Sequence, residues 1–295
     1  MSRRPARVRA LLLWLLGIAV VCGLLAGAGL WIVNSFKPAP PPLATGCTAA
    51  VADAKYTLAP DQAANAALIT AIAVRRGLPA RAASIALSVA IQESKLRNIP
   101  NGDLDSLGLF QQRPSQGWGT QAQVQDPVYA TNAFFDVLTQ VKGYESLPIT
   151  DAAQRVQRSA YPDAYAQREP QGRAFASALT GASPESLVCT LESPTAAGSP
   201  AAVLAELERG YGTVATSADG NTLRIPAGPA AGWGYAQWAV ANADALNITE
   251  VSFAGKHWVR SNNAGTTNAG WTPETGDAAG ADAGTVIITV HPAKP

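Results

Sequence analysis

The chain has 295 residues, with 22 basic and 21 acidic side chains and a formal net charge of +1. Residues 1–37 hold five of the basic residues and none of the acidic ones, so residues 38–295 hold 17 basic against 21 acidic residues. A region with a net charge of about −4 offers no basic surface, which excludes the nucleic-acid-binding class. The length is that of one or two globular domains.

The N-terminus is typical of a membrane anchor. Residues 1–10 form a basic tail with four arginines, and Leu11 to Val33 contain no charged residue. At about 1.5 Å per residue, a helix over 11–33 reaches about 34 Å, enough to cross the hydrocarbon core. The excess of basic charge before it predicts a single-pass plasma-membrane protein, with a cytoplasmic N-terminus and an extracytoplasmic remainder. The alternative is a signal peptide cleaved near Ala26-Gly27-Ala28.

Two linkers divide the remainder. A proline-rich linker over 34–46 precedes a domain over 47–191, and a second linker over 192–200 precedes a domain over 201–295. Cys47 and Cys189 lie at the two ends of the first of these domains. We expect them to form a disulfide that closes a loop of roughly 140 residues and stabilises the fold by about 4 to 5 kcal/mol. The alternative is two free, buried thiols.

The elements of the two domains differ. In 47–191 we expect helices over 63–76, 80–95, 128–141, 152–159 and 164–179, with almost no strand signal. In 201–295 we expect helices over 202–209 and 230–246, two hairpins and a final alternating strand over 285–291. The predicted fold class is therefore a mainly α catalytic domain and a small α+β accessory domain, preceded by one transmembrane helix. The four tryptophans of the accessory domain are typical of a small core, with wall-glycan or partner binding as the alternative.

Glu93 occupies the last turn of the helix predicted over 80–95. The negative end of the helix dipole and apolar neighbours both favour the protonated carboxyl group, as a general acid near neutral pH requires. The alternative is an ordinary solvated glutamate at a helix end.

A series of short motifs surrounds this glutamate, and the glutamine of a glycine-containing turn follows Glu93 at a separation of 18. In chain order the motifs are Glu93-Ser94, Leu96, Ser106, Gly108-Leu109-Phe110-Gln111, Asp126-Pro127 with Asn132, Phe134-Phe135, and Ala160-Tyr161. Together they resemble the catalytic domain of the soluble lytic transglycosylases, a lysozyme-like family, over about residues 80–165. The chain departs from the family's pattern at 97–105, at Gln112-Arg113-Pro114 and at Pro162.

The resemblance implies a lysozyme-like domain in which Glu93 is the catalytic acid and base and Tyr161 orients it. It also implies that glycan is contacted by residues around the glycine turn. The predicted substrate-binding residues are Ser94, Ser106, Gly108, Phe110, Gln111, Gln112 and Trp118. Trp118 lies between glycines and suits an aromatic platform for a sugar ring, with a buried core position as the alternative.

The implied reaction is cleavage of the MurNAc-GlcNAc bond of peptidoglycan with one carboxyl group and intramolecular closure of a 1,6-anhydro ring. A lysozyme-type hydrolase would need a second carboxylate, and Asp103 and Asp105 are the candidates; both also suit a turn. A non-catalytic wall-glycan-binding or assembly protein is the third possibility. Expected partners are peptidoglycan strands and the membrane, with cell-wall proteins as further possible partners. No cofactor or metal is expected, since His257 and His291, the two histidines of the chain, lack a supporting ligand set.

Overall fold

A computed structural model describes residues 14–17, 20–23, 44–158, 162–260, 270–274 and 284–293. The chain divides into two units, Met1–Pro41 and Pro42–Pro295. In the first unit, residues 14–17 and 20–23 are helical, and the remainder of the predicted span over 11–33 lies outside the described residues. No helix among the residues described is both long and apolar enough to cross a membrane.

The second unit begins with a small antiparallel sheet. Its strands are β1 (Gly46–Val51), β2 (Ala54–Leu58) and β3 (Leu187–Thr190), in the order β2-β1-β3. Cys47 and Cys189 are cross-strand partners in β1 and β3, and they form the expected disulfide across 142 positions of sequence. The disulfide therefore ties the first strand of the unit to the strand that ends its helical part.

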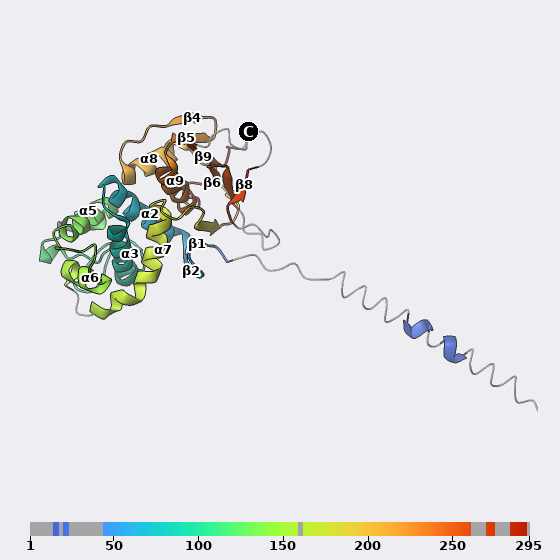
Figure 1. The fold of residues 1–295 in the computed structure, drawn as a ribbon, viewed down its shortest axis with the longest axis horizontal. Helices are drawn as coiled ribbons and strands as arrows, with labels where there is room; N and C mark the ends of the chain where they lie inside the picture. The colour runs from blue at the N-terminus through green and yellow to red at the C-terminus, as the bar shows by residue number, and fades with distance from the viewer. Residues whose placement is uncertain are drawn as a thin grey trace, which may run out of the picture. The chain divides into compact units, whose positions relative to one another are not determined.

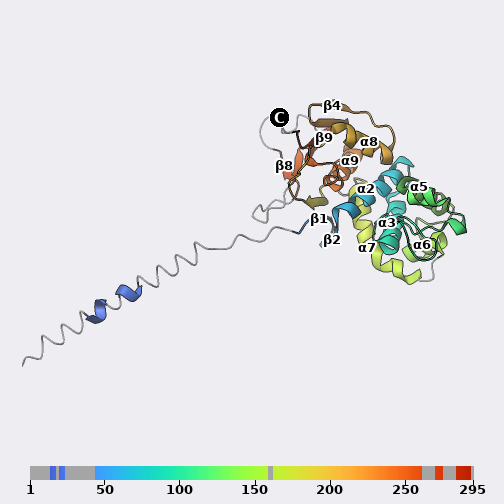
Figure 2. The same ribbon diagram turned by 180° about the vertical axis from the view of Figure 1, so that it is seen from behind.

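Helices fill the chain between β2 and β3. The elements are α2 (Pro60–Arg75), α3 (Ala80–Ser94), η1 (Pro114–Gln116), α4 (Gln121–Gln125), α5 (Pro127–Leu138), α6 (Ile149–Gln157), η2 (Pro162–Arg168) and α7 (Glu169–Leu179). Helix α3 is central and almost completely buried, and it packs most extensively on α7. Small residues allow this close approach: a Cβ on Gly172 of α7 would lie 2.3 Å from Oγ of Ser88. Both views show α3 and α7 side by side (Figures 1 and 2).

The C-terminal part holds a six-stranded antiparallel sheet and two helices. The strands are β4 (Ser217–Asp219), β5 (Thr222–Pro226), β6 (Ile248–Phe253), β7 (Lys256–Val259), β8 (Thr272–Pro273) and β9 (Thr285–Val290), in the order β4-β5-β9-β6-β7-β8. The helices are α8 (Pro200–Tyr211) and α9 (Pro229–Ala241), and α9 packs on β6 and β9. Trp233, Trp238 and Trp258 are buried, as expected for a tryptophan-rich core.

Buried hydrogen bonds tie the C-terminal part to β3. The side-chain amide of Gln237, which is fully buried in α9, accepts from the backbone N–H of Leu187 and donates to the carbonyl of Ala178. The indole N–H groups of Trp258 and Trp271 donate to the carbonyls of Cys189 and Leu187. Helix α9 also packs on α7. The division into two domains at 192–200 stays a prediction.

The predicted fold class, mainly α with a small α+β domain and a preceding transmembrane helix, is wrong. The described residues form a mixed α/β structure with two antiparallel sheets, and no helix among them can span a membrane. The missed sheet is built from strands of ambiguous composition, since β1 has the sequence Gly-Cys-Thr-Ala-Ala-Val. Its pairing with β3 joins residues more than 130 positions apart, which no local pattern reveals.

Candidate active site

Glu93 lies in the last turn of α3, which ends at Ser94 with Lys95 in the left-handed conformation as its C-cap. The hydroxyl of Tyr165 donates to Oε1 of Glu93 at 2.6 Å. The side-chain amide of Gln157, the last residue of α6, also hydrogen-bonds Glu93 and donates to the carbonyl of Phe110 at 2.8 Å. Side chains from η2 and α6 thus fix one carboxyl group at the end of α3.

Burial raises the pKa of the Glu93 carboxyl, and the hydrogen bonds from Tyr165 and Gln157 oppose this effect. Desolvation is the largest of these causes. It raises the pKa because burial penalises the charged carboxylate. The two donors become more favourable once the proton has left, since they stabilise the carboxylate. Burial thus favours the protonated carboxyl group and the two donors favour the carboxylate, which are the two forms that an acid that later acts as a base must adopt.

The glycine turn is a tight loop closed by backbone hydrogen bonds. Leu107 and Gln112 exchange two N–H to carbonyl bonds of 3.0 Å, which leaves residues 108–111 as the loop. Gly108 has a φ of 76°, and a Cβ there would lie 2.4 Å from the carbonyl oxygen of Val124. Glycine is therefore required at 108 by backbone conformation and by space.

Two side chains fasten this loop to the helices. The hydroxyl of Ser94 lies 2.7 Å from the carbonyl of Leu109 and 3.1 Å from that of Ala90, with both carbonyls as acceptors. Phe110 is fully buried and stacks on Phe134 of α5 with a centroid distance of 4.7 Å. We therefore assign Ser94 and Phe110 to fixing the loop relative to Glu93.

The other polar residues predicted to bind substrate also lie in or beside the loop. The amide of Gln112 is buried and donates to the carbonyl of Ala130, and Ser106 is largely buried beside the loop. The amide of Gln111 donates to the carbonyl of Gly108 and is half-buried. Gln111 therefore remains the most accessible of these predicted sugar contacts.

The insert at 97–105 folds back on the loop. The N–H of Gly108 donates to the carbonyl of Ile99 at 2.8 Å. Asp105 is held by Arg113 at 2.7 Å and accepts from the N–H of Ser115 at 2.7 Å. The Arg113 guanidinium and the Ser115 donors hold the pKa of Asp105 well below its usual range.

Asp103 is exposed, and its backbone carbonyl accepts from the N–H of Ser106. Neither Asp103 nor Asp105 shares a hydrogen bond or an ion pair with Glu93 in the part of the chain that the structure describes. Over the described residues, the structure thus brings neither of the two candidate carboxylates into contact with Glu93.

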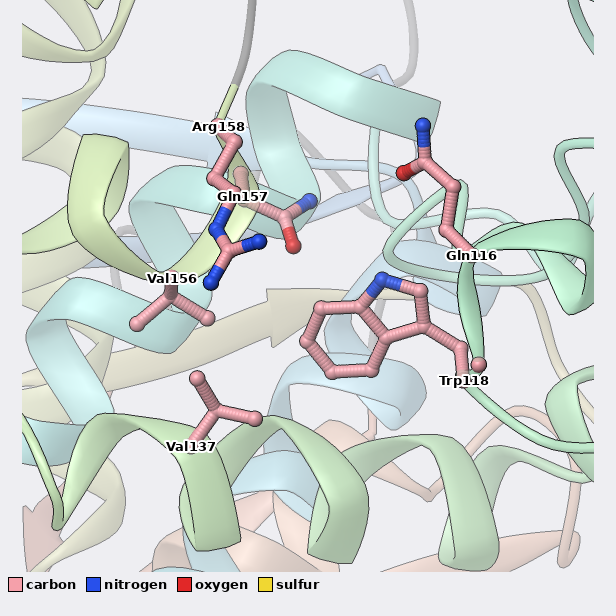
Figure 3. A pocket seen from close by; sticks show the side chains of 7 residues that line it. Gln116, Trp118, Val137, Val156, Gln157 and Arg158 are labelled. Atoms are coloured by element: carbon pink, nitrogen blue, oxygen red, sulfur yellow. The ribbon is translucent and has the colours of Figure 1, made fainter.

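A cavity of about 470 Å³ lies beside this carboxyl group. It is lined by Gln116, Gly117, Trp118, Val137, Val156, Gln157 and Arg158. Figure 3 shows the Trp118 indole on one side and the Gln157 and Arg158 side chains on the other, with Val137 on helix α5 below them. Gln157 both lines the cavity and bonds Glu93, so the carboxyl group lies one side chain away from it.

Tyr161, the tyrosine predicted to orient Glu93, lies outside the described residues. Tyr165, which the sequence reasoning missed, makes the contact and is fully buried. A signal was present, because Ala-Tyr occurs twice, at Ala160-Tyr161 and at Ala164-Tyr165. Gln157 was also missed, and it carries no comparable signal.

Among the residues that the structure describes, no group of three or more His, Cys, Asp or Glu side chains could hold a metal ion. Comparison with protein-family models finds no family that matches this sequence, and comparison with curated proteins finds no match. The geometry around Glu93 and the motifs are therefore the features that indicate a function.

Proposed function

We propose that this protein is a peptidoglycan lytic transglycosylase that cleaves the MurNAc-GlcNAc bond with Glu93 as acid and then base. The observation that supports this most is the environment of the Glu93 carboxyl group. Burial raises its pKa, and Tyr165 and Gln157 hold it beside a cavity with an aromatic wall. The spacing of the motifs that resemble this enzyme family supports the same reaction.

In the proposed first step, Glu93 donates its proton to the glycosidic oxygen while the bond from that oxygen to C1 breaks. The N-acetyl oxygen of the substrate forms a bond to C1 in its place. Tyr165 and Gln157 stabilise the carboxylate that results, since both donate to it.

In the second step, the Glu93 carboxylate takes the proton of the C6 hydroxyl of the same sugar. The C6 oxygen then attacks C1, which closes the 1,6-anhydro ring and breaks the bond between C1 and the N-acetyl oxygen. Glu93 ends protonated, as it began. A single carboxyl group suffices, which agrees with the engagement of Asp105 by Arg113 and Ser115.

We further propose that the enzyme works outside the cytoplasm. The Cys47–Cys189 disulfide supports this, because structural disulfides persist in oxidising compartments and are rare in the cytosol. Peptidoglycan lies in such a compartment, so the location of the substrate agrees with the disulfide.

The test is digestion of purified sacculi with the full chain, wild type and Glu93→Gln, followed by mass spectrometry of the released fragments. We expect anhydro-muropeptides from the wild type and at least a 100-fold lower yield from Glu93→Gln, since a positioned general acid contributes about 10²- to 10⁴-fold. Fragments with reducing ends would show that the enzyme is a hydrolase and would contradict the proposed transglycosylation. Release by neither protein would overturn the enzymatic proposal.

A further inference from the structure

A second cavity, of about 200 Å³, lies beside the C-terminal end of α3. Its lining includes Gln62 of α2, Ile91 and Lys95 at the end of α3, and Arg168 and Gln171 around the start of α7. Thr57 and Leu58 of β2 complete it. We call this cavity the basic pocket, because its two charged residues are both cations.

Neither cation of the basic pocket has an acidic partner among the described residues. The guanidinium of Arg168 donates through Nε to Oε1 of Gln92 at 3.0 Å, and the Lys95 ammonium makes no hydrogen bond or ion pair with any residue that the structure describes. The nearby carboxylates are engaged elsewhere, since Asp61 pairs with Arg97 and Glu169 pairs with Arg81. Two uncompensated cations beside one cavity favour an anionic ligand.

The amides of the pocket also indicate what kind of anion fits. Gln171 donates through Nε2 to the carbonyl of Thr57 at 3.3 Å, and its own side-chain oxygen accepts from no described residue. An acceptor next to two cations suits a ligand that carries both carboxylates and N–H donors. A peptide with free carboxylates has both groups.

The basic pocket adjoins the candidate active site through two neighbouring residue pairs. Arg168 holds Gln92, while Tyr165, three positions earlier in η2, holds Glu93. A glycan strand bound with its scissile bond at Glu93 carries a stem peptide on each MurNAc lactyl group. Peptides attached to sugars near the bond are therefore the nearest source of carboxylates.

We infer that the basic pocket binds a carboxylate of the stem peptide and so selects peptide-bearing over peptide-free glycan strands. This inference rests on the proposed function, because it takes the glycan strand as the substrate. Lys95 supplies an exposed charge, Arg168 supplies one that Gln92 holds in place, and the oxygen of Gln171 accepts a peptide N–H.

The test compares three strand preparations: strands with stem peptides, the same strands after an amidase has removed the peptides, and strands whose peptide carboxylates have been converted to carboxamides. The full chain is measured as wild type, Lys95→Gln, and Lys95→Gln with Arg168→Gln. Lys142→Gln with Arg209→Gln removes two charges outside the pocket and serves as the control.

We expect the wild type to have its lowest KM on carboxylate-bearing strands. On these, Lys95→Gln should raise KM about 2- to 5-fold and the double variant about 10-fold, as expected for exposed charge pairs. Lys95→Gln should reduce the difference between the three substrates, the double variant should erase it, and the control should keep it. Equal effects on all three substrates, or no effect on any, would overturn the inference.

Binding separates failure of this inference from failure of the proposed function. The affinity of the Glu93→Gln chain for the three preparations requires no catalysis. Cleavage by the wild type without any preference for carboxylates overturns the inference that the basic pocket binds the stem peptide and leaves the proposed enzymatic function intact. A carboxylate preference in binding, without cleavage by the wild type, overturns the enzyme and supports the pocket as part of a glycan-binding protein.

Discussion

The hydrogen bond from Tyr165 to Glu93 allows the sharpest test of the candidate site, through the substitution Tyr165→Phe. The phenol is fully buried and its hydroxyl lies 2.6 Å from Oε1, so Phe removes one donor and leaves the ring in place. A hydrogen bond to a charged group contributes about 1.5–3 kcal/mol. At about 1.4 kcal/mol per factor of ten, its loss should lower kcat/KM by roughly 10- to 150-fold.

The pH profile should change in a direction that a structural defect does not reproduce. The Tyr165 hydrogen bond lowers the pKa of Glu93, in opposition to burial. Its removal should raise that pKa further, so the alkaline limb of the rate profile moves to higher pH while the rate itself falls. The reason is that a carboxyl group with fewer donors holds its proton more tightly and transfers it less readily.

The assay is the initial rate of release of anhydro-muropeptides from sacculi between pH 4 and 9, with thermal unfolding of each protein as a check on folding. Tyr144→Phe is the matched control, because Tyr144 is also a buried tyrosine but makes no hydrogen bond to Glu93 in the described structure. A Tyr165→Phe enzyme with the rate and pH profile of the wild type would refute the positioning role. So would a loss of rate with an unshifted profile.

Three further predictions concern stability. Ser94→Ala should cost about 1–3 kcal/mol in urea unfolding, because it leaves a buried carbonyl unsatisfied, whereas Ser84→Ala, which removes a bond within α3 alone, should cost less than about 1 kcal/mol; equal costs would contradict the anchoring role. Reduction of Cys47–Cys189 should lower the free energy of unfolding by about 5 kcal/mol, and an unchanged urea midpoint after reduction would contradict this. Glu93→Gln should raise Tm at pH 8, because it removes the cost of desolvating a carboxylate, and should raise it by less at pH 4. The rise should be about 2–4 °C for each kcal/mol of unfolding free energy that is regained. A carboxyl whose folded-state pKa is raised stabilises the fold below its unfolded pKa and loses this contribution as pH rises through the folded pKa, so a gain that is larger at pH 4 would contradict the burial of this group.

The place of Glu93, the proposed acid, at the end of a helix and near the glycine turn could be predicted from the sequence because its determinants are local. Glu93 follows a run of apolar and small residues at helical spacing, and Gly108 begins a loop whose conformation requires glycine. The distance along the chain between the two is short enough for the helix end and the loop to meet.

The partners of the acid could not be predicted, because they arrive from distant elements. Tyr165 lies 72 positions from Glu93 and Gln157 lies 64 positions away. Choosing between Ala160-Tyr161 and Ala164-Tyr165 requires knowledge of how η2 packs against α3. For the same reason β1 and β3 could not be predicted. They form a sheet only when the helical part of the chain has folded and brought the two strands together.

The position of Asp105 gives the strongest structural reason for preferring transglycosylation to two-carboxylate hydrolysis. A nucleophilic or base carboxylate must be free to approach the sugar from the side opposite the acid, within about 5 to 9 Å of it. Asp105 instead accepts from Arg113, from the N–H of Ser115 and from the hydroxyl of Ser115, and these donors fasten the insert to the segment after the glycine turn. Freeing Asp105 for catalysis would break all three bonds and loosen the loop that helps to position Glu93. The substrate's own N-acetyl and C6 hydroxyl groups require no such rearrangement, so this loop is compatible with a reaction that uses one half-buried carboxyl group.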